Sequence, residues 1–352
     1  MSYFNNLKTA IDDGLSGKNE GLPTSLDRLD DYISIKKRMM ITVFGATGSA
    51  KSTLVNQAFV ISPWEYCLKE NIPIKIILFS MERSIIFTHG KQLVSRIFKD
   101  KGELIDLPVL LGWYKNKKLD MHEAKYVDQY EDYFNRMEED IDVYEGQRSP
   151  EEIDKIVEKY AEANGSYEDI GEGKTKYKPD NEREHVIIVL DHLGLTKKGK
   201  HLSKKAAIDT VVENTQHYRD FYGYTIINVS QVNRDLSKGN QEIFEPMMDH
   251  LKETGSIGEA SDLVLSIFDP IRYKTQDINY GDVSKFRCPR TGHKFFRNIG
   301  ILKNSYGIDG ASVGCVFMGQ TGILKTLPKA KDLNESWTEN DFEKIFTYRY
   351  FR

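Results

Sequence analysis

Long apolar runs and paired cysteines are both missing from this chain of 352 residues. No apolar stretch approaches the roughly 20 residues of a membrane-spanning helix, and the N-terminus has no signal-peptide core. The three cysteines, Cys67, Cys288 and Cys315, lie far apart, with neither a Cys-x-x-Cys pair nor a zinc-binding spacing. We therefore expect a cytoplasmic protein in a reducing compartment, without disulfides, a zinc framework or a membrane partner.

A strong excess of charge of one sign is also missing. The formal net charge is −4, so the overall balance does not indicate nucleic acid as a ligand. It does not exclude one either, because a ring that threads nucleic acid gathers basic groups in its channel while its outer faces stay acidic. Hydrophobic residues make up 39% of the chain and charged residues 29%, as in a soluble globular protein of one large or two small domains.

The stretch from Met39 to Thr53 has the pattern of a phosphate-binding loop. An apolar run that predicts a buried strand ends at a loop of small residues, and a helix restarts at Lys51. Loop N–H groups and the helix N-terminus would converge on phosphate oxygens, so we expect ATP as the ligand. Lys51 would reach the β- and γ-phosphates, and the Ser52 hydroxyl would complete the Mg²⁺ shell. The candidate nucleotide-binding residues are Gly45, Ala46, Thr47, Gly48, Ser49, Ala50, Lys51, Ser52 and Thr53.

One position departs from the pattern, because Ala50 stands where the motif has glycine before the lysine. The Cβ of alanine makes a close approach of phosphate strained rather than excluded. The alternative is a chance Gly/Ser turn ahead of a helix, which the matching strand upstream disfavours.

Apolar runs alternate with helix-type periodicity along the rest of the chain. Strands are expected at 74–80, 141–144, 185–190, 224–229 and 262–268, followed by a β-hairpin or meander from 298–303 and 312–317. Helices are expected at 3–13, 84–98, 122–137, 150–163 and 204–221, the fourth opened by a capping box at Ser149. This alternation predicts an α/β fold with a mostly parallel sheet flanked by helices and ligands at the carboxyl ends of its strands.

Polar residues follow three of these strands, where a ligand of the phosphate-binding loop would lie. Asp191 has the position of the acid that holds Mg²⁺, and Glu82 that of a carboxylate that polarises the attacking water. Gln231 could sense the γ-phosphate, although a polar residue at a strand end is uninformative alone. The alternatives are that Asp191 merely opens a loop and that Glu82 balances a helix dipole.

In order and spacing, these segments resemble the ATPase domain of DnaB-type replicative helicases, in superfamily four of the RecA-like proteins. The resemblance runs from roughly Phe4 to Leu327. The matching segments are Gly21–Asp30 before the phosphate-binding loop, Phe79–Glu82, Ile187–Asp191, Ser230–Arg234 and Asp249–Asp262. The last two of these are the most diagnostic, because generic P-loop ATPases lack them.

The resemblance implies a RecA-like core that hydrolyses ATP with Mg²⁺. It also implies a homo-oligomer, a hexameric ring that moves 5′ to 3′ on single-stranded DNA and unwinds duplex, with a primase, polymerase or loader as further partners. Lys252, Glu253 and Gly255 fall on positions that hold the DNA backbone in that family; the alternative is a solvated loop with ordinary charges. A compact chain of this kind suits a virus-encoded protein, in which case the host cytoplasm is its compartment.

The resemblance also shows a departure at the C-terminal hairpin. The family carries Lys-x-Arg there, and its arginine reaches the γ-phosphate bound by the neighbouring subunit. Here Lys303 is followed by Asn304 and Ser305, so Lys303 supplies charge in trans and the second cation is missing unless Arg297 or Arg290 replaces it. An arginine finger is worth several orders of magnitude in rate.

Three segments make up the expected domain organisation. Residues 1–20 would form a linker helix and tether that docks on a neighbouring subunit or, alternatively, packs on its own domain. Residues 21–328 would form the ATPase domain, with a mobile surface insertion at about 164–183. Residues 329–352 would be a tail, either a docking element or a terminal helix and strand on the same domain, and the collar domain of the family would be absent.

Two other functions remain open from the sequence. A recombination ATPase of the RecA or RadA type shares the core but forms filaments on DNA. A weakly hydrolysing, nucleotide-dependent assembly or loading module on DNA is supported by Ala50 and Ser305, whereas Glu82 and Asp191 argue for hydrolysis.

Overall fold

The structure is a computed structural model that describes residues 3–201, 203–232, 245–273, 275, 277–281, 283–287 and 295–333. Within these residues the helices are α1 (Tyr3–Leu15), α2 (Asp27–Asp30), α3 (Lys51–Val55), α4 (Ser62–Lys69), α5 (Ile85–Lys101), α6 (Leu107–Leu110), α7 (Met121–Asp128), α8 (Glu131–Asp140), α9 (Pro150–Ala163), α10 (Lys204–His217) and α11 (Gly255–Ala260). Two π-helical segments, Asn56–Ile61 and Tyr218–Tyr222, continue α3 into α4 and extend α10.

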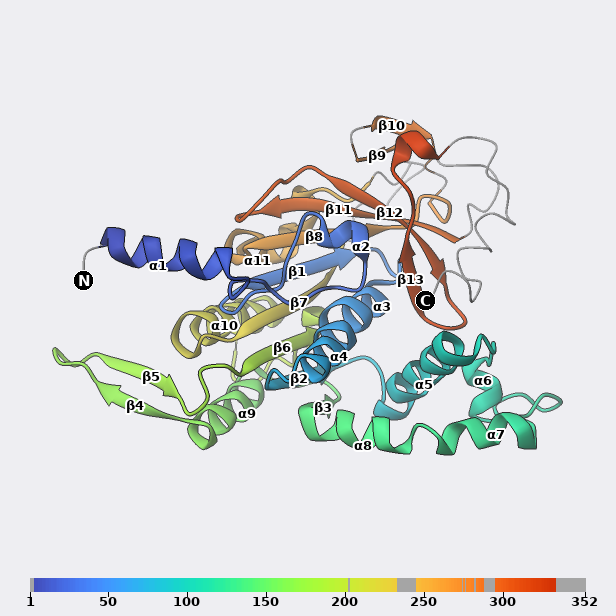
Figure 1. Ribbon diagram of the computed structural model, residues 1–352, viewed down its shortest axis with the longest axis horizontal. Helices are drawn as coiled ribbons and strands as arrows, with labels where there is room; N and C mark the ends of the chain where they lie inside the picture. The colour runs from blue at the N-terminus through green and yellow to red at the C-terminus, as the bar shows by residue number, and fades with distance from the viewer. Residues whose placement is uncertain are drawn as a thin grey trace.

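The strands form one large sheet and two small ones. They are β1 (Met40–Gly45), β2 (Ile74–Ser80), β3 (Ile141–Glu145), β4 (Gly165–Asp169), β5 (Thr175–Pro179), β6 (His185–Asp191), β7 (Thr225–Gln231), β8 (Leu263–Phe268), β9 (Asp277–Tyr280), β10 (Val283–Arg287), β11 (Phe296–Asn304), β12 (Ser312–Met318) and β13 (Ile323–Thr326). The nine-stranded sheet has the order β13-β12-β11-β8-β1-β7-β6-β2-β3 (Figure 1).

The predicted fold class is confirmed. Strands β8, β1, β7, β6, β2 and β3 are parallel, and β11, β12 and β13 add an antiparallel edge. The six parallel strands are nearly continuous apolar runs because helices cover both faces of the sheet. The phosphate-binding loop follows β1, which lies in the interior of the sheet between β8 and β7.

Alternation of side chains along β1 divides the core into two layers. Ile41 and Val43 face the layer that contains Leu54, Phe59 and Trp64 from the helical segment after the phosphate-binding loop. Met40 faces the opposite layer, which α9 and α10 cover with apolar side chains such as Val157 and Val211. Since successive strand residues point to opposite faces, both layers depend on one register.

The expected insertion at about 164–183 is an ordered β-hairpin, so its description as a mobile surface segment was wrong. Strands β4 and β5 pair antiparallel, and the hairpin extends away from the sheet in Figure 1. Tyr167 and Tyr177 pair across it and stack against Phe221. Aromatic rings therefore supply the apolar contact that the absence of aliphatic residues led us to overlook.

Other elements show where sequence boundaries were accurate and where they were not. The helix at 150–163 and the strand at 74–80 have the predicted bounds. The helix expected at 122–137 is broken into α7 and α8, and β9, β10 and β13 were not foreseen. The C-terminal tail from residue 334 onward lies outside the described residues.

Replacing Ser149 by alanine tests the capping box that starts α9. The Ser149 hydroxyl accepts a hydrogen bond from the Glu152 N–H, and the Glu152 carboxylate accepts one from the Ser149 N–H. Losing the cap should lower the free energy of unfolding by about 1 kcal/mol, measured by urea denaturation. Ser149→Asn keeps an acceptor and should stay near the wild type; equal losses in both variants would contradict the capping role.

Candidate nucleotide-binding site

The loop after β1 bends back on itself before α3 begins. Gly48 and Ala50 both have left-handed backbone conformations, with φ angles of 79° and 80°. A residue with a Cβ is strained at such an angle, by about 1–2 kcal/mol. The structure thus explains why the motif has glycine at the position of Ala50, and it shows that the chain still forms the loop with alanine there.

Lys51 lies inside the loop that it follows. Its Nζ donates hydrogen bonds to the carbonyl oxygens of Gly45 and Ala46 at 2.8 and 2.9 Å, and the residue is only 8% exposed. Burial lowers the pKa of Lys51 to about 8, the nearby Arg83 adds to this, and Asp191 and Glu82 oppose it. A bound phosphate would replace the carbonyls as the counter-charge of this ammonium group.

Parallel pairing brings the polar strand ends together. Gly45 of β1 is the register partner of Gln231 in β7, and Ser80 of β2 is the partner of Asp191 in β6. The N–H of Met81 donates to the Asp191 carbonyl at 2.8 Å, which holds Glu82 over the same edge. Glu82, Asp191 and Gln231, predicted from three separate strands, therefore line one cavity with Lys51 and Ser52.

His192 was missed by the sequence reasoning and connects two of these residues. Its Nε2 lies 3.0 Å from Nε2 of Gln231 and 3.9 Å from Oε2 of Glu82. Burial lowers the pKa of His192, although Asp191 and Glu82 oppose that shift. A neutral imidazole can accept the Gln231 amide N–H, so His192 orients this side chain. The sequence signal was its place directly after Asp191.

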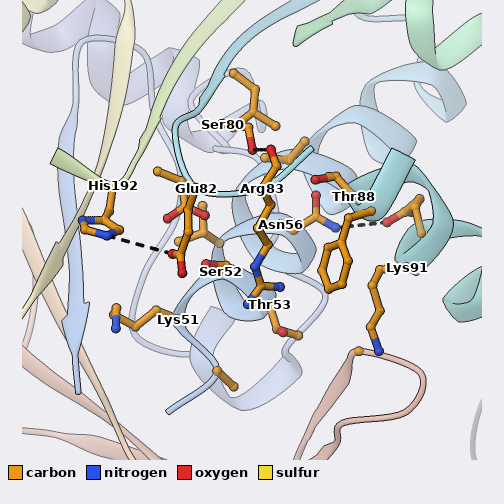
Figure 2. A pocket seen from close by; sticks show the side chains of 18 of the residues that line it. Lys51, Ser52, Thr53, Asn56, Ser80, Glu82, Arg83, Thr88, Lys91 and His192 are labelled. Atoms are coloured by element: carbon orange, nitrogen blue, oxygen red, sulfur yellow. Dashed lines mark hydrogen bonds and ion pairs between the residues drawn. The ribbon is translucent and has the colours of Figure 1, made fainter. Parts of the chain in front are cut away.

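The cavity has a volume of about 500 Å³ and extends from the phosphate-binding loop toward α5 and the β12–β13 turn. Figure 2 shows Lys51, Ser52, Glu82 and Arg83 pointing into it from different elements. The N-terminal part of α5 contributes Phe87, Thr88 and Lys91, none of which the sequence indicated. The Lys91 Nζ donates to the carbonyl oxygens of Gly319 and Gln320, both at 2.9 Å, and so ties α5 to the β12–β13 turn.

The site suits a magnesium ion bound together with a phosphate ligand. One carboxylate oxygen of Asp191 is buried without a hydrogen-bond partner. Burial raises the pKa of Asp191, while the adjacent Ser52 hydroxyl, His192 and Arg83 lower it. Clusters of three or more His, Cys, Asp or Glu that could hold a metal ion alone are not found in the part of the chain that the structure describes. Ser52 and Asp191 match the preference of Mg²⁺ for few protein ligands alongside phosphate oxygens and water.

Lys303 does not join this cavity. It pairs with Val264 near the start of β8, whereas the phosphate-binding loop follows the end of the parallel strand β1. Its Nζ donates to the carbonyl oxygens of Gly258 and Glu259 at 3.2 and 2.9 Å, at the end of α11. Lys303 therefore lies at the opposite edge of the sheet from the phosphate-binding loop of its own chain.

The candidate DNA-binding residues also lie outside the cavity. Lys252 and Glu253 fall in the 3₁₀-helical segment Met248–Thr254, and Gly255 starts α11. Arg234, in the segment matched to the glutamine sensor, lies outside the described residues, as does Arg290.

Arg297 does not replace the missing arginine. The residue is 6% exposed and its Nη2 lies 2.9 Å from Oδ2 of Asp269 in a buried ion pair. Its Nη1 donates to the Phe296 carbonyl oxygen, and its guanidinium stacks on the Phe317 ring. A guanidinium held in this way supports the sheet and is not available to a neighbouring subunit.

A family model described as "DnaB-like helicase C terminal domain" matches residues 21–321. The chain belongs to the DnaB-like helicase family. Membership implies ATP-hydrolysing helicase activity in DNA replication. No curated protein sequence matches the chain.

Solved structures of two DnaB-like helicases share the RecA-like fold. The first, a structure of an ATPase domain alone, matches with a TM-score of 0.67 and 14% identity, over 93% of this chain and 99% of that one. A structure of a DnaB-like replicative helicase and its interactions with primase matches with a TM-score of 0.64 and 16% identity, over 93% and 67% of the two chains. None of the described helices is long and apolar enough to cross a membrane.

The lowered pKa of Lys51 predicts a pH dependence of nucleotide binding. Above pH 8 the free lysine loses its proton, and phosphate binding must restore it, so affinity for ATP should fall up to tenfold per pH unit. Calorimetry in buffers of different ionisation enthalpy should show proton uptake on binding at pH 9 and little near pH 7. Lys51→Met should bind weakly without this proton uptake; uptake that persists in the variant would assign it to another group.

Replacing Arg297 by methionine tests the structural role of its ion pair. The change leaves Asp269 buried and unpaired, so the free energy of unfolding should fall by about 3–5 kcal/mol in urea denaturation. The double variant Arg297→Met/Asp269→Leu should recover a large part of the loss. An Arg297→Met protein with wild-type stability would contradict the assignment.

Proposed function

We propose that this chain is the motor of an ATP-driven replicative DNA helicase, a hexameric ring that moves 5′ to 3′ along single-stranded DNA and unwinds duplex. One observation carries the proposal. Lys51, Ser52, Glu82, Asp191 and Gln231 come from separate parts of the sequence and line a single cavity at the carboxyl edge of the sheet. The family to which the chain belongs uses such a site for ATP hydrolysis.

Each of these residues has a role that its position supports. The N–H groups from Gly45 to Thr53 and the Lys51 ammonium group bind the phosphates. Ser52 and Asp191 would hold Mg²⁺, which neutralises charge on the phosphate oxygens. The exposed Glu82 carboxylate accepts the proton of the attacking water, and Gln231, oriented by His192, reports the γ-phosphate.

Assembly into a ring would place each ATP between subunits. Lys303 lies at the far edge of its own sheet, so it can act only on the nucleotide of a neighbour. Helix α1 supports the same arrangement, since none of its residues is buried. Phe4, Leu7 and Ile11 form an apolar stripe on α1 and are 71%, 56% and 54% exposed, which suits docking of residues 1–20 on the adjacent subunit.

DNA would pass through the centre of the ring beside the segment that contains Lys252, Glu253 and Gly255. A lysine and the N–H of a glycine suit contacts to phosphates, which carry no base sequence. Hydrolysis around the ring would shift these segments in turn and carry the strand through. A primase, polymerase or loader is the expected class of further partner.

The departure at Ser305 favours a second candidate, a nucleotide-dependent assembly or loading module with little hydrolysis. Ser305 N–H donates to the Asp262 carbonyl oxygen, so this position serves the local turn and supplies no cation. Glu82 and Asp191 argue for the motor, because a module that only binds nucleotide has no use for a general base.

Turnover and strand separation distinguish the two candidates. Single-stranded DNA should stimulate ATP hydrolysis by the wild-type chain, and a 5′-tailed fork should be opened. Glu82→Gln should reduce kcat by at least about 10²-fold because the general base is lost, while ATP binding changes little. Nucleotide binding without DNA-stimulated turnover would favour the loading module, and filaments instead of rings in electron micrographs would favour a recombination ATPase.

A further inference from the structure

Arg83 lies next to the candidate general base and lines the same cavity. It follows Glu82 in the turn between β2 and α5, and the Ser80 hydroxyl holds this turn by donating to the Arg83 carbonyl oxygen at 2.8 Å. In Figure 2 its side chain projects into the cavity, on the side where α3 begins. A short, hydrogen-bonded turn therefore fixes Glu82 and Arg83 relative to each other.

The Arg83 guanidinium has no acidic partner among the residues that the structure describes. It lies over the Phe87 ring, with 4.8 Å between the guanidinium carbon and the ring centroid. Other arginines of the chain are occupied: Arg96 pairs with Glu65 and Asp100, and Arg297 pairs with Asp269. Stacking on an aromatic face positions an arginine without neutralising it, so its charge stays available to an anion.

Arg83 is also close enough to the phosphate-binding residues to affect their charge. After burial, it contributes to the lowered pKa of Lys51, and it helps to lower the pKa of Asp191 against the effect of burial. Two cations from different elements, Lys51 after the loop and Arg83 after β2, thus converge on one cavity. An anion with several charges, such as the terminal phosphate of ATP, would satisfy both.

We propose that Arg83 is an arginine finger supplied by the same subunit that binds the ATP, in place of the arginine missing at Ser305. The proposal rests on the proposed hydrolysis of ATP at this site. Arg83 is a catalytic residue here because its N–H groups contact the γ-phosphoryl oxygens.

The reaction itself is hydrolysis. The oxygen of a water molecule forms a bond to the γ-phosphorus, and the bond from that phosphorus to the bridging oxygen breaks, leaving its electron pair on ADP. The water proton passes to Glu82, and inorganic phosphate is released. Arg83 stabilises the negative charge on the three equatorial oxygens in the transition state, where arginine fingers contribute about 10³ to 10⁵ in rate.

Kinetics of two Arg83 variants give the first test. With single-stranded DNA, Arg83→Ala should lose about 10³-fold in kcat with only a few-fold change in the KM for ATP. Arg83→Lys should recover little, because a lysine cannot make the two parallel hydrogen bonds of a guanidinium. The control is Arg148→Ala, which removes an arginine stacked on the Tyr144 ring outside the cavity and should keep wild-type kcat. Wild-type kcat in Arg83→Ala would overturn the proposal.

Binding of a transition-state mimic gives a readout that does not require turnover. Aluminium fluoride should tighten the binding of MgADP to the wild type, and Arg83→Ala should lose at least about 100-fold of that gain while binding MgADP alone normally. An unchanged gain would overturn the proposal. If the wild type does not turn over ATP, the proposed motor function fails, and this measurement still decides the role of Arg83.

Mixing of inactive variants shows which subunit supplies the arginine. If Arg83 acts within its own subunit, mixtures of Glu82→Gln and Arg83→Ala chains contain no complete site and stay inactive. Mixtures of Glu82→Gln and Lys303→Ala chains should regain activity, because Lys303 acts on a neighbour in the proposed ring. Recovery in the first mixture would overturn the assignment to the same subunit, and failure of only the second would contradict the role of Lys303.

Discussion

The parallel register of β1, β7, β6 and β2 is the constraint on which the site depends. It places the end of β1 beside Gln231 and the end of β2 beside Asp191. This register is maintained by core packing, because a shift of one residue would move every buried side chain of a strand to the opposite face. The apolar runs that form the core thus also bring the phosphate-binding loop, the metal-binding acid and the general base together.

Much of this arrangement could be predicted from the sequence, for physical reasons that differ between elements. Buried parallel strands are continuous apolar runs, so the strand at 74–80 has the predicted bounds. The helix at 150–163 also has them, because a capping box and a proline mark its start. Lys51, Ser52, Glu82, Asp191 and Gln231 followed from a rule that holds for any parallel sheet: ligands bind at the carboxyl ends of the strands.

Contacts that depend on three-dimensional packing could not be predicted. The β4–β5 hairpin is stabilised by tyrosines that stack on Phe221, a residue distant in the sequence. Whether Arg297 was free or occupied depended on Asp269, which no local pattern links to it. Arg83 and Phe87 follow Glu82 closely, but only the path of the turn into α5 shows that Arg83 enters the cavity.

Cations at the two edges of the sheet divide the proposed work between subunits. Lys51 and Arg83 serve the nucleotide of their own chain, and Lys303 at the other edge serves a neighbour. The measurement that tests this division most directly is a structure of the assembled chain with Mg²⁺, ADP, aluminium fluoride and single-stranded DNA. We predict the phosphates in the loop before α3, the metal at Ser52, and Arg83 and a neighbour's Lys303 at the fluoride. A nucleotide bound elsewhere, or a metal far from Ser52 and Asp191, would contradict it.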